Sequence, residues 1–130
     1  MPAYNTFLFD PPAPIAKVTL RNLQNGLTLP DVALLIDSGS DITIVPQASA
    51  NHIGVPSILD ASYQVEGFKG SPLVMPVAIL EMLFLNRIFK GQFLLTDQDY
   101  VILGRNVLNN VAILLNGPGL SWDEYHLFTR

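Results

Sequence analysis

The chain has 130 residues, of which 49% are hydrophobic and 14% charged, and its formal net charge is −4. This length predicts one domain, and so few charges indicate extensive burial rather than disorder. The acidic balance argues against a nucleic-acid partner, and the absence of cysteine excludes a disulfide framework and thiol chemistry.

The sequence also gives no sign of a membrane partner. A membrane-spanning helix needs about 18 consecutive apolar residues, and the most apolar stretch, Leu73 to Leu85, is broken by Pro76 and Glu81. The start of the chain lacks the basic segment and apolar core of a secretory signal, because Asp10-Pro11-Pro12 interrupts it early. We therefore expect a protein of the cytoplasm.

The first elements predicted are an arm and a hairpin. Met1 to Pro14 contains four prolines, which deny a sheet its donors, so we expect an extended N-terminal arm followed by one domain over residues 15–130. Ile15 to Leu20 alternates in the way of a strand. Asn25-Gly26 is a strong turn signal that joins this strand to the run from Leu27 to Ile36.

An abrupt polar turn interrupts the next apolar run. The run ends in Asp37-Ser38-Gly39-Ser40-Asp41, and a second, β-branched run from Ile42 to Val45 is stopped by Pro46. This pattern predicts two buried strands joined by a tight turn. A carboxylate at the end of a buried strand is costly to desolvate, so Asp37 needs partners or a function. The alternative is that Asp-Ser-Gly is only a turn.

The remaining elements are mostly strands. Gln47 to Ile53 is expected to form a short helical turn that ends at Gly54. Tyr63 to Glu66 and Ser71 to Val74 predict a hairpin with the tip Gly67-Phe68-Lys69-Gly70. Further strands are predicted over Val77–Leu85, Ile88–Leu95, Tyr100–Leu103, Val111–Leu115 and Leu120–Phe128, with a helical turn or two over Arg105–Asn110 and turns at Thr96–Asp99 and Asn116–Gly119. Eight or so short strands with little helix indicate a mainly antiparallel β-barrel.

A second motif lies well downstream of the first. Ile102-Leu103-Gly104-Arg105-Asn106-Val107-Leu108 places a Gly-Arg-Asn triplet between pairs of apolar residues. Together with Leu35-Ile36-Asp37-Ser38-Gly39-Ser40-Asp41, in this order and at this spacing, it resembles the two motifs of the retropepsin-like (retroviral-type) aspartic proteases. The resemblance covers the chain from about Ile15 to Phe128. It implies a closed antiparallel barrel with a flap hairpin and one short helix.

The resemblance also implies an activity. Such proteins hydrolyse peptide bonds with water activated between two aspartates, one ionised and one protonated. This chain has one Asp-Ser-Gly motif, and Asp41 is too close in sequence to meet Asp37 across a cleft. The resemblance therefore implies a homodimer in which each subunit supplies one Asp37 and the substrate is a peptide or flexible protein segment.

Further roles follow from the resemblance, position by position. Asp37, Ser38 and Gly39 form the catalytic motif. Ser40 and Asp41 lie next to the substrate, and Asp41 also pairs with Arg105 as a structural support near a buried turn. The predicted hairpin corresponds to the flap, so its tip residues are expected to contact substrate: Glu66, Gly67, Phe68, Lys69 and Gly70.

Two features depart from the viral pattern. The chain continues from Asn109 to Arg130 after the late motif, whereas viral members usually end soon after it. The tip at residues 67–70 also lacks the repeated Ile-Gly-Gly of viral flaps. The sequence therefore looks closer to the cellular and bacterial members than to the viral ones.

Several alternatives stay open at this point. The first is a retropepsin-fold module that dimerises or binds peptides without cleaving them, because fold alone does not establish activity. A small barrel that binds an apolar ligand is another, although it leaves Asp37 and Arg105 unexplained, and the predicted hairpin could be an ordinary surface hairpin. His52 and His126 lack further ligands at metal-binding spacing, so we expect no metal and no other cofactor.

Overall fold

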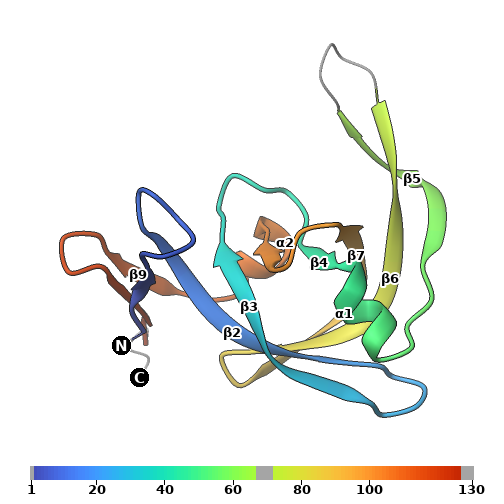
Figure 1. The fold of residues 1–130 in the computed structure, drawn as a ribbon, viewed down its shortest axis with the longest axis horizontal. Coiled ribbons are helices and arrows are strands. Elements are labelled where there is room, and N and C mark those ends of the chain that lie inside the picture. The colour runs from blue at the N-terminus through green and yellow to red at the C-terminus, as the bar shows by residue number, and fades with distance from the viewer. Residues whose placement is uncertain (1, 67–71, 127–130) are drawn as a thin grey trace.

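The computed structural model describes residues 2–66 and 72–126, and for residues 59–66 and 72–75 it describes the backbone only. Most of the chain is strand, as the alternating and β-branched runs predict, and the strands wrap around one core (Figure 1). Within the described residues two short helices interrupt the strands, α1 (Gln47–His52) and α2 (Arg105–Leu108). Both lie where a helical turn was predicted from the sequence, although the resemblance implied one short helix.

Six strands close into a barrel. In spatial order they are β2 (Ala13–Arg21), β3 (Thr28–Ile36), β8 (Val101–Leu103), β4 (Ile44–Pro46), β7 (Arg87–Thr96) and β6 (Pro72–Phe84). The barrel closes because β6 also pairs with the end of β2, with Met82 opposite Leu20. The prediction of a mainly β fold with a closed barrel is confirmed.

Two of the pairings in the barrel are parallel, and they position the two sequence motifs. β3 runs parallel to β8, with Ile36 beside Leu103, so both strands end at the same edge. β4 then passes back next to β8 in the antiparallel sense and runs parallel to β7. The residues that follow β3 and β8, which belong to the two motifs, therefore lie next to each other although many residues separate them in the chain.

The apolar faces of these strands fill the barrel. Alternation along β2 places Ala16, Val18 and Leu20 inside, as the sequence pattern predicts. The largest side chains that are fully or almost fully buried include Phe84, Leu20, Leu34, Ile53, Leu80, Met82 and Leu103. Trp122 closes one end of the core, where its ring lies 6.3 Å from that of Phe84.

The N-terminal segment lies along the domain instead of extending away from it. β1 (Tyr4–Asn5) pairs with the start of β2, with Tyr4 opposite Pro14. On its other side this segment meets the last strand, since the Trp122 N–H donates to the Pro2 carbonyl oxygen at 3.0 Å. The prolines on which the prediction of an arm rests are compatible with this because the pairing covers only two residues of β1.

The last two strands form a separate small sheet. β9 (Ile113–Asn116) and β10 (Ser121–Glu124) pair in an antiparallel hairpin around a turn at residues 117–120, one residue later than the predicted turn at Asn116–Gly119. β10 ends four residues earlier than the strand predicted to reach Phe128, and residues 127–130 lie outside the described residues. Figure 1 shows this hairpin beside the N-terminal segment, at the side of the barrel.

The predicted hairpin between the two motifs is formed by β5 (Ile58–Glu66) and the first half of β6. Its last described pair is Glu66 opposite Pro72, and the predicted tip, Gly67 to Gly70, lies outside the described residues. Among the residues that the structure describes, no helix has the length and apolar character needed to cross a membrane.

Candidate active site

Asp37 is the first residue after β3, at the edge where β3 and β8 end together. Its N–H donates to the Leu103 carbonyl oxygen at 3.2 Å, which extends the parallel pairing by one bond beyond the strands. Its carbonyl oxygen accepts the Ser40 N–H at 3.2 Å, which closes the turn. The backbone of Asp37 is thus fixed on both sides, while its side chain is partly exposed.

Gly39 completes this turn. Its N–H donates to Oδ1 of Asp37 at 3.0 Å, so the carboxylate is held by the loop that carries it. A Cβ atom at position 39 would lie 3.2 Å from the same oxygen, closer than most such contacts. A side chain here would therefore crowd the carboxylate, so this position favours glycine.

Gly104 is the residue that brings the second motif against the first. A Cβ atom at this position would lie 2.5 Å from the backbone carbon of Ile42 and 2.7 Å from its carbonyl oxygen. Backbone atoms cannot yield to such an approach as the end of a flexible side chain can. Only glycine therefore lets the backbone after β8 pass this close to the Asp37–Thr43 loop.

Thr43, which is buried, and Asn106, which lies at the surface, form a hydrogen-bond network that fixes this approach. Oδ1 of Asn106 accepts the N–H of Thr43 at 2.9 Å and its hydroxyl at 2.8 Å. The same hydroxyl accepts the Gly104 N–H at 3.0 Å, and Thr43 is fully buried. Sequence reasoning did not assign a role to Thr43; the available signal was a single hydroxyl inside an otherwise apolar, β-branched run.

The start of α2 is also tied to the Asp37 loop. The Arg105 N–H donates to the Ser40 carbonyl oxygen at 2.8 Å and the Asn106 N–H to that of Asp41 at 3.2 Å. The Arg105 side chain reaches further along the loop, where Nη1 donates to the Ser38 carbonyl oxygen at 2.6 Å. Four consecutive loop residues, 37–40, are therefore held by bonds to one another or to the β8–α2 segment.

Arg105 and Asp41 form an ion pair, through Nη2 and Oδ1. The pair is largely exposed in the single chain, since the Arg105 side chain is 44% exposed and that of Asp41 81%. The reason is that the start of α2 and the far side of the loop both face solvent. An exposed pair of this kind typically contributes about 0–1 kcal/mol, well below the value for a buried pair.

Ser40 is one of the residues predicted to contact substrate, and its side chain forms a hydrogen bond inside the loop. Its hydroxyl donates to the Ile42 carbonyl oxygen at 2.8 Å. Ser38, in contrast, is exposed. The backbone of Glu66 ends β5, and the other predicted flap residues, Gly67, Phe68, Lys69 and Gly70, lie outside the described residues.

A single chain provides one suitable carboxylate at this site. Asp37 points to the loop surface and Asp41 is engaged by Arg105, so the loop offers no second free acid. Within residues 2–66 and 72–126 there is no cluster of three or more His, Cys, Asp or Glu residues that could hold a metal ion. His52 and His126 are both exposed.

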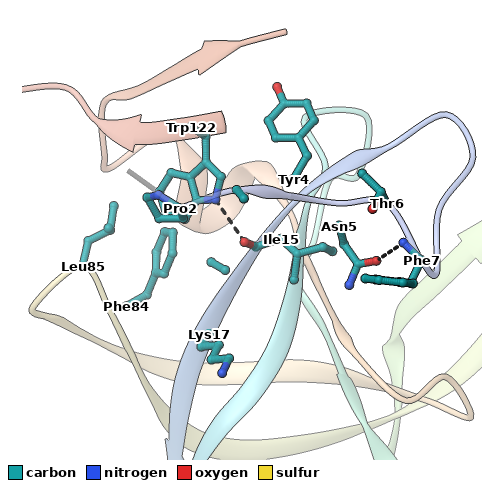
Figure 2. Close-up of a pocket in the computed structure, with 12 residues that line it drawn as sticks. Pro2, Tyr4, Asn5, Thr6, Phe7, Ile15, Lys17, Phe84, Leu85 and Trp122 are labelled. Atoms are coloured by element: carbon teal, nitrogen blue, oxygen red, sulfur yellow. Dashed lines mark hydrogen bonds between the residues drawn. The ribbon is translucent and has the colours of Figure 1, made fainter. Parts of the chain in front are cut away.

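A cavity of about 580 Å³ lies away from Asp37, between the N-terminal segment and β10. Figure 2 shows Tyr4, Ile15, Phe84 and Trp122 around it. Trp122 is anchored there, because its Nε1 donates to the Ile15 carbonyl oxygen at 3.0 Å (Figure 2). Asp37 does not line this cavity, so it is not a cleft of the kind that peptide hydrolysis at Asp37 requires.

Comparison with known proteins is consistent with the barrel. No protein family profile matches the chain, and no curated protein matches it in sequence. Among solved structures, a retroviral protease, EIAV protease complexed with the inhibitor HBY-793, is similar with a TM-score of 0.57 and 20% sequence identity. The match covers 75% of this chain and 86% of that chain. The fold is therefore of the retropepsin type.

Proposed function

We propose that the protein is an aspartic endopeptidase that is active as a homodimer, with Asp37 of each subunit at a shared site. The observation that carries the proposal is the fixed position of Asp37. Its backbone is bonded to Leu103 and Ser40, its carboxylate accepts the Gly39 N–H, and its side chain is left partly exposed. A partly exposed carboxylate on a rigid loop is suited to chemistry rather than to packing.

The proposed mechanism is general acid–base activation of water. When two Asp37 carboxylates face each other about 3 Å apart, repulsion prevents both from being ionised, so the pair holds one proton. The ionised carboxylate takes a proton from water as the water attacks the peptide carbonyl carbon. The protonated carboxyl polarises the carbonyl oxygen and then donates its proton to the amine nitrogen as the C–N bond breaks, so the pair again holds one proton.

The other motif residues have supporting roles in this proposal. Gly39 leaves space around the carboxylate, and Ser38, which is exposed on the loop, is available to the second subunit. Hydrogen bonds that join Gly104, Arg105 and Asn106 to Ser38 and Thr43 keep the loop in place. The substrate is a peptide or a flexible protein segment, with the β5–β6 hairpin folding over it.

Several finer expectations remain predictions. A relation to cellular and bacterial members rather than viral ones rests on the residues after α2, and a cytoplasmic location is also still a prediction. Contact between substrate and the tip at residues 67–70 is expected from the resemblance alone.

Peptide-library cleavage at pH 3 to 7 tests the proposal. Wild-type protein should cut, Asp37→Asn should not, and an aspartic-protease inhibitor of the statine type should abolish the wild-type activity. Asp31→Asn is a matched control. Asp31 is an exposed aspartate within β3, the strand that leads to Asp37, but it lies away from the loop. Its activity should equal that of wild type.

Mixing wild type with Asp37→Asn tests whether the site is shared. If each dimer needs two intact aspartates, an equal mixture at constant total protein should fall to about one quarter of the wild-type rate, because mixed dimers are inactive. A fall to one half would mean that each subunit acts alone. A folded, dimeric wild type that cuts nothing would favour the non-catalytic dimerisation or peptide-binding module.

A further inference from the structure

The hairpin of β9 and β10 exposes an unusual number of apolar side chains for its size. Leu114 and Leu115 are each 52% exposed and Leu120 is 42% exposed. Leu115 lies opposite Trp122, so both point to the face that meets the barrel, yet Trp122 is buried and Leu115 is not. β9 therefore extends beyond the barrel and leaves apolar surface on both of its faces.

The two edges of this hairpin differ. The outer edge of β10 is covered by the N-terminal segment, because the Tyr4 N–H donates to the Leu120 carbonyl oxygen at 2.8 Å and the Trp122 N–H to that of Pro2 at 3.0 Å. β9, in the part of the chain that the structure describes, pairs with β10 alone. The outer edge of β9 is thus available for pairing.

The bonding pattern tells which backbone groups face that open edge. Backbone groups of successive strand residues point alternately to the two sides. Since the N–H of Trp122 points toward the N-terminal segment, the neighbouring residues of β10, Ser121 and Asp123, face β9. Their partners on β9 are Asn116 and Leu114, so the backbone groups of Ile113 and Leu115 point outward.

Nothing in β9 protects this edge. Natural proteins usually guard an exposed edge strand with a charge, a proline or a bulge. The sequence of β9 is Ile-Leu-Leu-Asn, which contains no charged residue and no proline, and its register with β10 is regular. A strand with these properties is suited to pairing with another strand.

We propose that β9 is the dimer interface of this protein and that its occupant is β9 of a second copy. This inference rests on the proposed function, which requires two copies because one chain supplies one Asp37. An antiparallel pair of identical strands has two-fold symmetry, as a shared catalytic site demands. A different partner strand would leave the site with a single Asp37.

The outward groups also fix the register. If the two-fold axis passes at Leu114, Ile113 of one copy lies opposite Leu115 of the other, and their outward N–H and carbonyl groups bond in both directions. Leu114 then lies opposite Leu114 of the second copy in a non-hydrogen-bonded pair, with Cα atoms about 4.5 Å apart. The small sheets of the two copies join into one continuous sheet.

The position of β9 suits a shared site at Asp37. A stable dimer buries on the order of 800 Å² per partner, more than four residues provide, so the interface must extend beyond the strand. In the view of Figure 1 the blue loop before β2 stands between the β9 hairpin and the loop after β3. A partner that pairs with β9 and reaches the Asp37 loop must therefore also lie against the N-terminal segment.

A single cysteine tests this register directly, because the natural chain contains none. Leu114→Cys should form an intermolecular disulfide on mild oxidation, since the expected Cα separation lies within the range that a disulfide spans. Leu27→Cys is the control, because Leu27 has the same 52% exposure but lies in the β2–β3 turn. The control should cross-link far more slowly, and equal rates for the two variants would overturn the proposal.

Leu115→Pro tests the backbone pairing. Proline removes an N–H that points outward and leaves the bonds between β9 and β10 in place. Sedimentation should show the dimer dissociation constant raised at least about tenfold, since each lost bond counts twice in a symmetric dimer. Unchanged fluorescence of Trp122, which lies opposite this position, would show that the hairpin is still folded.

The results separate this inference from the proposed function. A Leu114→Cys protein that cross-links, together with a dimeric wild type that cuts no peptide, supports the interface and refutes the activity. A wild type that cuts peptide, with Leu115→Pro equally dimeric and Leu114→Cys not cross-linked, supports the activity and overturns the interface. A wild type that stays monomeric at its highest soluble concentration also overturns the interface.

Discussion

Removal of the Thr43 hydroxyl should reveal how strongly the Asp37 loop depends on its hydrogen-bond network. Thr43→Val keeps the shape of a side chain that is 0% exposed. The Gly104 N–H, which donates to that hydroxyl, then loses its acceptor, while Asn106 still accepts the Thr43 N–H. An unsatisfied buried donor costs about 1–3 kcal/mol, so the free energy of unfolding should fall by roughly this amount.

Urea unfolding followed by Trp122 fluorescence measures this change, because the chain has one tryptophan. A lower midpoint with an unchanged slope reports lost stability alone. Thr96→Val is the control, since the Thr96 hydroxyl accepts a local bond from the Gln98 N–H in an exposed turn. It should change the stability by less than about 0.5 kcal/mol.

The same variant links stability to activity. If the network holds the loop that carries Asp37, the Thr43→Val protein should also lose peptide cleavage under conditions in which it is still folded. A Thr43→Val protein that unfolds at the wild-type midpoint would refute the reasoning, because the Gly104 N–H would then be satisfied without the hydroxyl.

Three further predictions concern the second motif. Gly104→Ala should prevent stable folding or lower the urea midpoint more than any other single change here, because its Cβ would lie 2.5 Å from the Ile42 backbone; a midpoint near that of wild type would contradict this. Asn106→Asp retains an acceptor oxygen for both Thr43 bonds and should unfold near the wild-type midpoint, whereas Asn106→Leu should lower stability by about 1–3 kcal/mol. Arg105→Ala should cost only about 1 kcal/mol in thermal or urea unfolding, because its ion pair is exposed, yet it should reduce peptide cleavage by freeing the loop at Ser38. Full cleavage activity of a folded, dimeric Arg105→Ala would argue against that positioning role.

The individual strands could be predicted from the sequence because burial leaves a local pattern. β3 is an apolar run that ends at Asp37, and α1 ends before Gly54, whose φ is +76°. Which strands pair is a different matter. The parallel alignment of Ile36 with Leu103 depends on how the whole sheet closes, and no pattern within either strand encodes it.

The candidate site shows the same division. The two motifs were visible as residue types at a spacing, and the structure brings Arg105 to Asp41 and to the Ser38 carbonyl. The buried role of Thr43 was not visible, because a hydroxyl in a β-branched run has the same pattern whether or not it is bonded inside the core. The solvent exposure of the ion pair was also hidden, since exposure depends on surfaces that form only in the folded chain.

The bonds that hold the Asp37 loop join residues that are remote in the chain. Gly104 and Thr43 are 61 residues apart, Thr43 and Asn106 are 63 apart, and Arg105 and Ser38 are 67 apart. Contacts of this separation form late in folding, because the entropy cost of closing a long loop comes before the stabilisation that the contacts provide. During synthesis, the segment that carries Asp37 therefore leaves the ribosome long before the residues that shape it. In the proposed peptidase, the loop that carries Asp37 therefore lacks its supporting bonds until folding is almost complete.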